Sequence, residues 1–187
     1  MKYLIVGLGN IGNQYTNTRH NIGFMILDAL AEASNVVFED KRYGFVAETS
    51  YKGRTFQLLK PSTFVNLSGN AVRYWLNKAK VPMENLLVVV DDIALDFGTI
   101  RLRKKGGPGS HNGLNHISQV LGNQNFARLR FGIGNEFPKG AQVHYVLGEW
   151  TEDEVKELPN KIQKSIEAIQ AFGFLGIELA MTQYNSK

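Results

Sequence analysis

The 187-residue chain contains no cysteine, so disulfides, thiolate nucleophiles and cysteine-based zinc sites are all excluded. No run approaches the roughly 18 apolar residues of a membrane helix, and the N-terminus lacks the basic start and apolar core of a signal peptide. Repeats, low-complexity segments and linkers rich in proline or glycine are also missing. We therefore expect a single cytoplasmic domain spanning residues 1–187, long enough to bury a proper core.

The charge balance is mildly positive, with 21 lysines and arginines against 17 acidic residues. Such a balance fits either simple solubility or a polyanionic partner, and the placement of the charges decides between them. Alternation along a strand places the arginines of each basic strand on one face. They could guard a solvated edge strand, but their proximity to Asn112 favours a phosphate clamp. The clustered basic residues are Arg101, Arg103, Lys104, Lys105, Arg128 and Arg130.

Short apolar runs rich in β-formers interleave with segments of helical period along the whole chain. This alternation predicts an α/β fold, a single-domain sandwich with a mixed, mostly parallel central sheet flanked by helices. The run at 86–90 is the most continuous and predicts a central strand buried on both faces. The other expected strands are 3–6, 44–47, 55–59, 99–103 and 128–133, and the expected helices cover 22–33, 69–78, a segment opening just after 112, and 152 to about 173, with a short one to about 181.

The stretch from Lys2 to Asn21 contains the first candidate site. Its opening strand breaks at two glycines and leaves Asn10 at the strand's carboxyl end, the edge where open α/β sheets bind ligands. His20 follows in a polar segment without apolar period, so it is not a core-filling residue, and a histidine titrates near neutrality. We expect Asn10 and His20 to share one pocket.

The same stretch also contains Gly7-x-Gly9-x-x-Gly12, the spacing of a dinucleotide-binding fingerprint. That fingerprint needs a helix to open at once, so that its N-terminus holds the pyrophosphate, and residues 13–21 are polar and aperiodic instead. It also needs an acidic residue after the next strand, whereas Asp28 lies within a helical pattern. A nucleotide-dependent oxidoreductase is therefore disfavoured.

Polar residues stand where several apolar elements end. Taken singly, each asparagine is more simply a turn or a helix cap. Together with His20 they suggest hydrolysis: a neutral histidine takes a proton from water, a carboxylate fixes its tautomer, and amides donate to the carbonyl oxygen. Without cysteine or a G-x-S-x-G elbow, water is the natural nucleophile and an ester or amide the natural substrate. These residues are Asn10, Asn66, Asp91 and Asn112.

The remaining histidines do not have the spacing of a metal site. His111 and His116 are five residues apart, not the four that would place them on one helix face, and no H-E-x-x-H occurs. We expect His111 to serve the structure of its loop or to contact substrate, and His116 and His144 to be surface or packing residues. We expect neither a metal nor a cofactor.

Several motifs, in order along nearly the whole chain, resemble those of bacterial peptidyl-tRNA hydrolase. The most specific are the Arg-His-Asn segment and the Ser-His-Asn-Gly loop. The motifs are Gly7–Asn10, Tyr15 with Arg19–Gly23, Lys60–Gly69, Gly109–Leu114, Phe126–Gly134, Tyr145–Leu147 and Ala180–Asn185.

The resemblance implies a monomeric enzyme that cleaves the ester between a peptide and the 3′ end of tRNA, without metal or cofactor. It would bind the acceptor stem and 3′ CCA end and recycle tRNA from peptidyl-tRNA released by stalled ribosomes. By the same resemblance, His20 is the general base and Asp91 is its carboxylate partner. The three asparagines hold the peptide and the 3′ end. One of them also assists the oxyanion or the water, and Asn10 is the candidate for this catalytic role. The pocket-lining residues are Tyr15, Val65 and Gly109, and those that grip tRNA phosphates are Arg103, Lys104 and Arg130.

Some positions depart from the family pattern. Val65 stands where a methionine is usual, which shortens the pocket wall, and residues 92–98 lack the usual prolines of the turn. Asp91 is preferred over Asp92 as the partner because it follows directly on the strand. A non-catalytic RNA-binding protein on the same fold is the alternative, but it would need the basic residues without needing His20 and Asp91.

Overall fold

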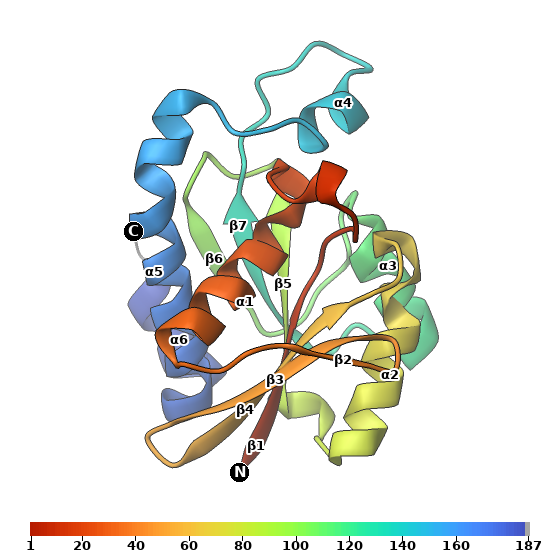
Figure 1. The fold of residues 1–187 in the computed structure, drawn as a ribbon, viewed down its shortest axis with the longest axis vertical. Helices are drawn as coiled ribbons and strands as arrows, with labels where there is room; N and C mark the ends of the chain where they lie inside the picture. Colours follow the sequence, from red (N-terminus) through yellow and green to blue (C-terminus); the bar gives the residue numbers. More distant parts are fainter. Residues whose placement is uncertain (186–187) are drawn as a thin grey trace.

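Residues 1–185, which the computed structural model describes, form a seven-stranded mixed sheet between two layers of helices (Figure 1). The strand order is β2-β3-β4-β1-β5-β7-β6. The four central strands, β4, β1, β5 and β7, are parallel, and the outer pairs are antiparallel. The strands are β1 Lys2–Gly7, β2 Glu39–Lys41, β3 Gly44–Tyr51, β4 Arg54–Pro61, β5 Leu86–Asp92, β6 Ile100–Arg103 and β7 Ala127–Gly132.

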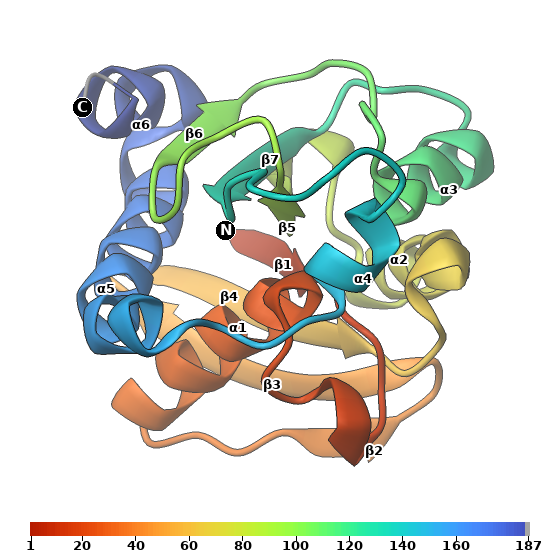
Figure 2. The ribbon, with the colours of Figure 1, turned by 90° about the horizontal axis from the view of Figure 1, so that it is seen from above.

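Helices cover both faces of this sheet, so the predicted α/β sandwich with a mixed sheet is confirmed. Helices α1, α5 and α6 pack on one face and α2 and α3 on the other, as the view from the pocket end shows (Figure 2). The short α4 lies over the carboxyl ends of the central strands. The helices are α1 Ile22–Ala33, α2 Ser68–Ala79, α3 Asn112–Leu121, α4 Gln142–Val146, α5 Glu152–Leu175 and α6 Ile177–Tyr184.

The central strands β1 and β5 contribute side chains to both hydrophobic cores, one on each face of the sheet. Residues of β1 and β5 point alternately into the two helix layers, with Ile5 and Val89 on the α1–α5 side and Val6 and Val88 on the α2–α3 side. All four are fully buried. A strand covered on both faces must be apolar at every position, which is why the run at 86–90 is continuous instead of alternating.

Two of the glycines in the fingerprint-like stretch serve close packing. A Cβ on Gly7 would lie 2.4 Å from the carbonyl oxygen of Gly23 in α1, and one on Gly9 would lie 2.9 Å from the Asn21 side chain. The chain directly after Gly12 forms a single 3₁₀ turn, Asn13–Tyr15, and not the long helix that the fingerprint requires. The helix N-terminus that a pyrophosphate needs is therefore missing from this position.

Three local features differ from the expectation. Strand β2 and helix α4 were not predicted, because elements of three and five residues are too short to show a clear period. Helix α5 runs past Gly173 to Leu175 instead of stopping near the glycine. A Cβ on Gly173 would lie 2.3 Å from the Phe56 ring, so this glycine lets α5 approach β4 and does not end the helix.

None of the helices formed by residues 1–185 combines the length and the apolar character that crossing a bilayer requires.

Candidate active site

A pocket of about 690 Å³ opens at the carboxyl ends of β1 and β5, below α4. It is the edge at which parallel sheets of this class bind ligands. Six separate segments meet there: the loop between β1 and α1, the turn before α2, the end of β5 with the turn after it, the glycine-rich loop before α3, strand β7, and α4 with the residue after it. The predicted site residues that line it are Asn10, His20, Val65, Asn66, Asp91, Gly109, Asn112 and Arg130.

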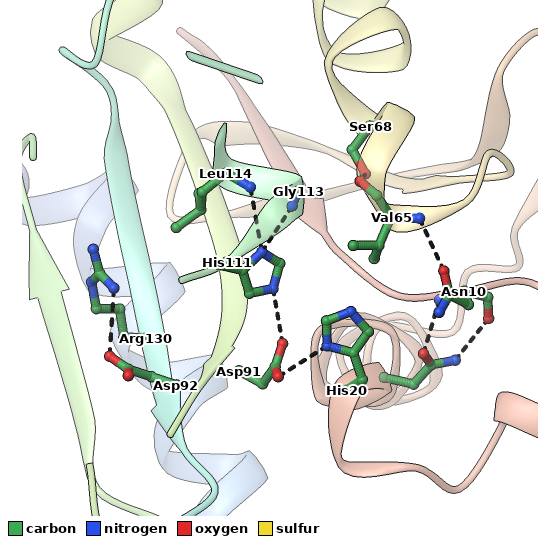
Figure 3. A network of polar contacts seen from close by, with 11 residues as sticks. Asn10, His20, Val65, Ser68, Asp91, Asp92, His111, Gly113, Leu114 and Arg130 are labelled. Carbon is green, nitrogen blue, oxygen red and sulfur yellow. Dashed lines mark hydrogen bonds and ion pairs between the residues drawn. The ribbon is translucent and has the colours of Figure 1, made fainter. Parts of the chain in front are cut away.

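Asp91 lies at the centre of the polar network in the pocket floor (Figure 3). Its Oδ2 lies 3.0 Å from Nδ1 of His20, and its Oδ1 lies 2.9 Å from Nε2 of His111. Asp91 is the second-last residue of β5 and is buried, whereas His20 sits on the 3₁₀ turn Arg19–Asn21. One carboxylate therefore holds two imidazoles, whose rings stack at a centroid distance of 5.2 Å.

The hydrogen bonds of His111 fix where the protons lie. His111 is the N-cap of α3, and its Nδ1 accepts the backbone N–H groups of Gly113 and Leu114 at 3.1 and 3.3 Å. That nitrogen carries no proton, so the ring's N–H is on Nε2 and donates to Asp91. The second oxygen of Asp91 then accepts the Nδ1–H of His20. The unprotonated nitrogen of neutral His20 is Nε2.

The same contacts shift two pKa values in opposite directions. Burial alone raises the pKa of Asp91, but the attraction of His20 and His111 and the hydrogen bonds from both rings outweigh it and hold that pKa well below its ordinary value. Burial lowers the pKa of His20, yet the charge of Asp91 and its hydrogen bond leave that pKa raised above 6.5. Asp91 is thus a carboxylate at neutral pH, and His20 gains its proton more readily than an ordinary histidine.

Asn10 is held on both its backbone and its side chain. The amide of Asn21 accepts the Asn10 N–H and donates to the Asn10 carbonyl, both at 2.9 Å, and Asn21 is buried. The Oδ1 of Asn10 accepts the backbone N–H of Val65 at 2.9 Å. This bond uses the acceptor of the Asn10 amide and leaves its N–H donors for a ligand. Asn66 and Asn112, both exposed, line the same pocket.

Three predicted site residues lie outside the pocket lining. Tyr15 is on the 3₁₀ turn before Thr18, whose N–H and hydroxyl both bond the Tyr15 carbonyl. Arg103 is exposed on the edge strand β6. Lys104 pairs with Glu178 of α6, with Nζ 2.9 Å from Oε1, at an exposed position.

Arg128 does not have the exposure that a phosphate clamp needs. Its side chain is completely buried, with its guanidinium carbon 4.3 Å above the Phe126 ring. It donates to the carbonyls of Gly107, Gln124 and Phe126, and burial, with the neighbouring charge of Arg130, lowers its pKa to about 10. The prediction of one arginine face on β7 was correct in register, but Arg128 anchors the glycine-rich loop instead of facing solvent.

Arg130 keeps the position expected of an anion-binding residue. It lines the pocket, donates to the Gly107 carbonyl at 3.0 Å and lies 3.5 Å from Asp92. The β6–β7 register pairs Arg101 with Arg130 and Arg103 with Arg128. These pairs place four arginines at this corner of the sheet, and the nearby carboxylates are Asp92 beside Arg130 and Glu178 paired with Lys104.

Sequence reasoning missed the buried support of the site. Arg19 stacks 4.1 Å from the Tyr145 ring centroid, donates to the Tyr145 carbonyl and pairs with Glu154 at 3.3 Å. It thereby ties the His20 turn to α4 and to the start of α5. Helix α4 and the residue after it supply an unpredicted pocket wall that includes Val143, Val146 and Leu147. The sequence signals were the polarity of the Arg-His-Asn segment and the family motif Tyr145–Leu147, and neither indicates which residues contact each other.

The two histidines and Asp91 also have a spacing that a metal ion could use, since one ligand atom of each lies within 4.8 Å of the others. A metal would have to replace the two hydrogen bonds that already join the three side chains. The nitrogen and oxygen atoms that could bind a metal ion therefore already have hydrogen-bond partners.

Comparisons with known proteins agree with one another. Residues 4–187 match the family model described as peptidyl-tRNA hydrolase. Proteins named peptidyl-tRNA hydrolase from Phocaeicola vulgatus and Cytophaga hutchinsonii are 58% and 52% identical to the chain over 187 residues, covering 100% of both sequences in each case. The crystal structure of peptidyl-tRNA hydrolase from Acinetobacter baumannii superposes with a TM-score of 0.91 at 32% identity, covering 98% of this chain and 94% of that one. The chain therefore belongs to the peptidyl-tRNA hydrolase family of enzymes.

Proposed function

We propose that the chain hydrolyses the ester between a peptide, or an N-blocked amino acid, and the 3′ end of tRNA. The observation that carries the proposal is the bridge from His111 through Asp91 to His20 in the floor of a pocket lined by three asparagines. A protein that only binds RNA has no need of a carboxylate that orients a histidine. Family membership supplies the substrate class.

The reaction follows from the proton positions. Neutral His20 accepts a proton from water at Nε2, while its Nδ1–H stays bonded to Asp91. The hydroxide equivalent adds to the ester carbonyl, and the carbonyl oxygen takes the charge. When the C–O bond to the ribose breaks, the imidazolium returns its proton to the leaving 3′ oxygen, so the products are a peptide acid and a tRNA with a free 3′ hydroxyl. Asp91 stabilises the imidazolium throughout, because the pKa of Asp91 keeps it ionised.

The amides serve the ligand. Asn10, with its acceptor bound to Val65, presents N–H donors, and Asn66 and Asn112 face the same cavity. Donors fixed before the reaction stabilise a developing oxyanion without reorganising, and catalytic assistance by Asn10 is part of the proposal. Val65 belongs to an apolar wall completed by α4, which suits a peptide side chain.

The basic corner beside the pocket suits the RNA. Arg130 opens onto the pocket, and Arg103 and Lys104 continue outward along the edge strand. A phosphate backbone placed over this corner would reach Arg130, Arg103 and Lys104, whereas Arg128 is buried and out of its reach. We assign the acceptor stem to this corner and the 3′ CCA end to the pocket. A monomer acting in the cytoplasm to recycle tRNA from stalled ribosomes completes the proposal.

The test is release of free tRNA from an N-acetylated aminoacyl-tRNA, with a chelator present, by wild type and by His20→Ala. We expect cleavage by wild type and loss of at least about 10²-fold in the variant, the usual contribution of a general base, with tRNA binding retained. Equal cleavage by both proteins would refute the role of His20. Tight tRNA binding without cleavage by either would favour the non-catalytic RNA-binding alternative.

A further inference from the structure

A second groove, of about 390 Å³, lies between α2 and the turn that joins β2 to β3. It shares no lining residue with the active-site pocket, and it stands at the opposite edge of the sheet from β6 (Figure 2). The groove is lined by arginine, tyrosine and asparagine side chains. Among the residues that the structure describes, no carboxylate lines it. The lining residues are Arg42, Tyr43, Asn70, Arg73, Tyr74 and Asn77.

The positive charge of this groove is uncompensated and partly fixed in place. The guanidinium of Arg42 lies 5.2 Å from the Tyr43 ring centroid and 5.4 Å from that of Tyr74, and the two rings meet edge to face at 5.5 Å. Within the part of the chain that the structure describes, neither Arg42 nor exposed Arg73 forms an ion pair. Stacking against aromatic rings limits the freedom of Arg42 while its N–H donors stay exposed.

The backbone of the turn is held in a costly conformation. Tyr43 has a φ of 65°, in the left-handed region that glycine and asparagine adopt more easily. Two bonds fix it there: Nε1 of Trp75 donates to the Arg42 carbonyl, and the Ser62 N–H donates to the Tyr43 carbonyl, both at 2.8 Å. This conformation places the Tyr43 ring against Arg42 and Tyr74. Strain of this kind, offset by surrounding bonds, concentrates at functional positions.

We propose that this groove is a second RNA-binding surface, in which Arg42 and Arg73 hold backbone phosphates and an unpaired base stacks on the tyrosine rings. Arginine pairs with phosphate, and aromatic rings stack any base, so the two residue types together suit an unpaired strand. Asn70 and Asn77, one and three turns along α2, can donate to base edges. A lining of arginines without a carboxylate, among the residues described, excludes a cationic ligand.

The position of the groove connects it to the proposed substrate, and in this respect the inference rests on the proposed function. Asn70 follows pocket-lining Asn66 by four residues, so the groove begins about one helical turn from the pocket. On the other side of the pocket lies Arg130. Four strand spacings separate β3 from β7, or about 19 Å. A single tRNA bound across the pocket mouth could therefore contact both cationic surfaces.

The experiment measures the affinity of uncharged tRNA as a function of salt for wild type, Arg42→Ala/Arg73→Ala, and a matched control. The control, Lys156→Ala/Lys164→Ala, removes the same charge from α5 on the opposite sheet face. We expect the groove variant to bind about tenfold more weakly near 0.1 M salt and to lose up to about 1.4 from the log–log salt slope, at about 0.7 per phosphate that the groove neutralises on an unpaired strand. The control should keep the wild-type slope.

Further arms identify the occupant. Arg42→Lys/Arg73→Lys should keep most of the slope, because it keeps the charge, and Tyr74→Leu should weaken binding with the slope unchanged, because it removes a stacking ring. Loss of affinity for an eight-nucleotide single strand as well as for tRNA identifies any unpaired RNA as the ligand, and loss for tRNA alone identifies the substrate. A wild-type slope and affinity in Arg42→Ala/Arg73→Ala would overturn the groove while leaving ester cleavage intact. Failure of wild type to cleave, with the groove variant still weakened, would overturn the proposed function and not the groove.

Discussion

The bridge through Asp91 predicts an unusual result for Asp91→Asn. An amide at position 91 has one acceptor and one donor for two histidines that both donate to the native carboxylate. His111 cannot change its tautomer, because its Nδ1 is committed to two backbone N–H groups of α3. The new carbonyl must therefore face His111, and the new NH₂ must face His20. His20 then accepts at Nδ1 and carries its proton on Nε2, where the attacking water needs a base.

The magnitude can be worked from the two hydrogen bonds of Asp91. If the amide turned its NH₂ toward His111, that NH₂ and the Nε2–H of His111 would be two hydrogen-bond donors facing each other in a buried site. This arrangement costs about 2 to 3 kcal/mol. The imidazolium of His20 is also deprived of a charge-assisted hydrogen bond of 3.0 Å, which contributes about 2 to 3 kcal/mol. The sum, about 4 to 6 kcal/mol, corresponds to a decrease of about 10³- to 10⁴-fold in kcat.

A second substitution tests this tautomer assignment. His111→Ala alone should lower kcat, because Asp91 loses a donor and α3 loses its cap. Added to Asp91→Asn, however, it frees the amide to turn its carbonyl toward His20, so the double variant should be about tenfold faster than Asp91→Asn alone. This factor corresponds to recovery of about half of the orientation cost.

The assay is single-turnover cleavage of an N-acetylated aminoacyl-tRNA, with thermal unfolding to confirm that each variant is folded. His116→Ala in the Asp91→Asn background is the matched control, since His116 also lies on α3 but accepts from Gly69 N–H at 2.9 Å and does not touch Asp91. A double variant as slow as Asp91→Asn, or slower, would refute the tautomer assignment.

Two further predictions follow from the same site and its supporting loop. The pKa of His20 is raised, and the proposed mechanism uses its neutral form as the base, so kcat/KM should rise with pH to a plateau through a midpoint above 6.5. A midpoint below 6.5 would contradict this coupling to Asp91. Arg128→Met should lower the free energy of unfolding by about 1 to 3 kcal/mol, because it removes three hydrogen bonds and leaves the buried Phe126 carbonyl without its Arg128 donor. Arg130→Met should change that free energy by less than about 1 kcal/mol, and equal effects of the two variants in urea unfolding would show that burial of Arg128 is not what anchors the loop.

The elements that position the site could be predicted from the sequence because their patterns are strong. The apolar run before Gly7 predicted a buried strand and the run before Asp91 predicted a central one, and the two strands are parallel neighbours in the sheet. The carboxyl ends of parallel neighbours meet at one edge, and the strand order of the structure therefore places Asn10 and Asp91 in one pocket. The aperiodic polar segment around His20 follows directly on β1, so it begins at the same edge of the sheet.

What lies over a strand face could not be predicted in the same way. Alternation correctly put Arg128 and Arg130 on one face of β7, but it does not say which part of that face a loop will cover. The glycine-rich loop covers Arg128 and leaves Arg130 at the pocket. Tyr15 illustrates the same limit, since the direction of a side chain on a single 3₁₀ turn depends on tertiary contacts and not on a period.

His111 shows why the most informative contact was also the least visible. The pairs His20–Asp91 and His111–Asp91 are separated by 71 and 20 residues along the chain, and no local pattern connects them. In the sequence His111 was equally compatible with loop structure and with substrate contact, and the structure gives it a third role. The backbone N–H groups at the start of α3 determine the tautomer of His111. His111 occupies one oxygen of Asp91 and leaves the other to bind His20. That bond holds the proton of neutral His20 on Nδ1 and leaves Nε2 unprotonated. The protonation pattern of His20 is therefore set by the backbone of a helix, a rigid group that titration near neutrality does not alter.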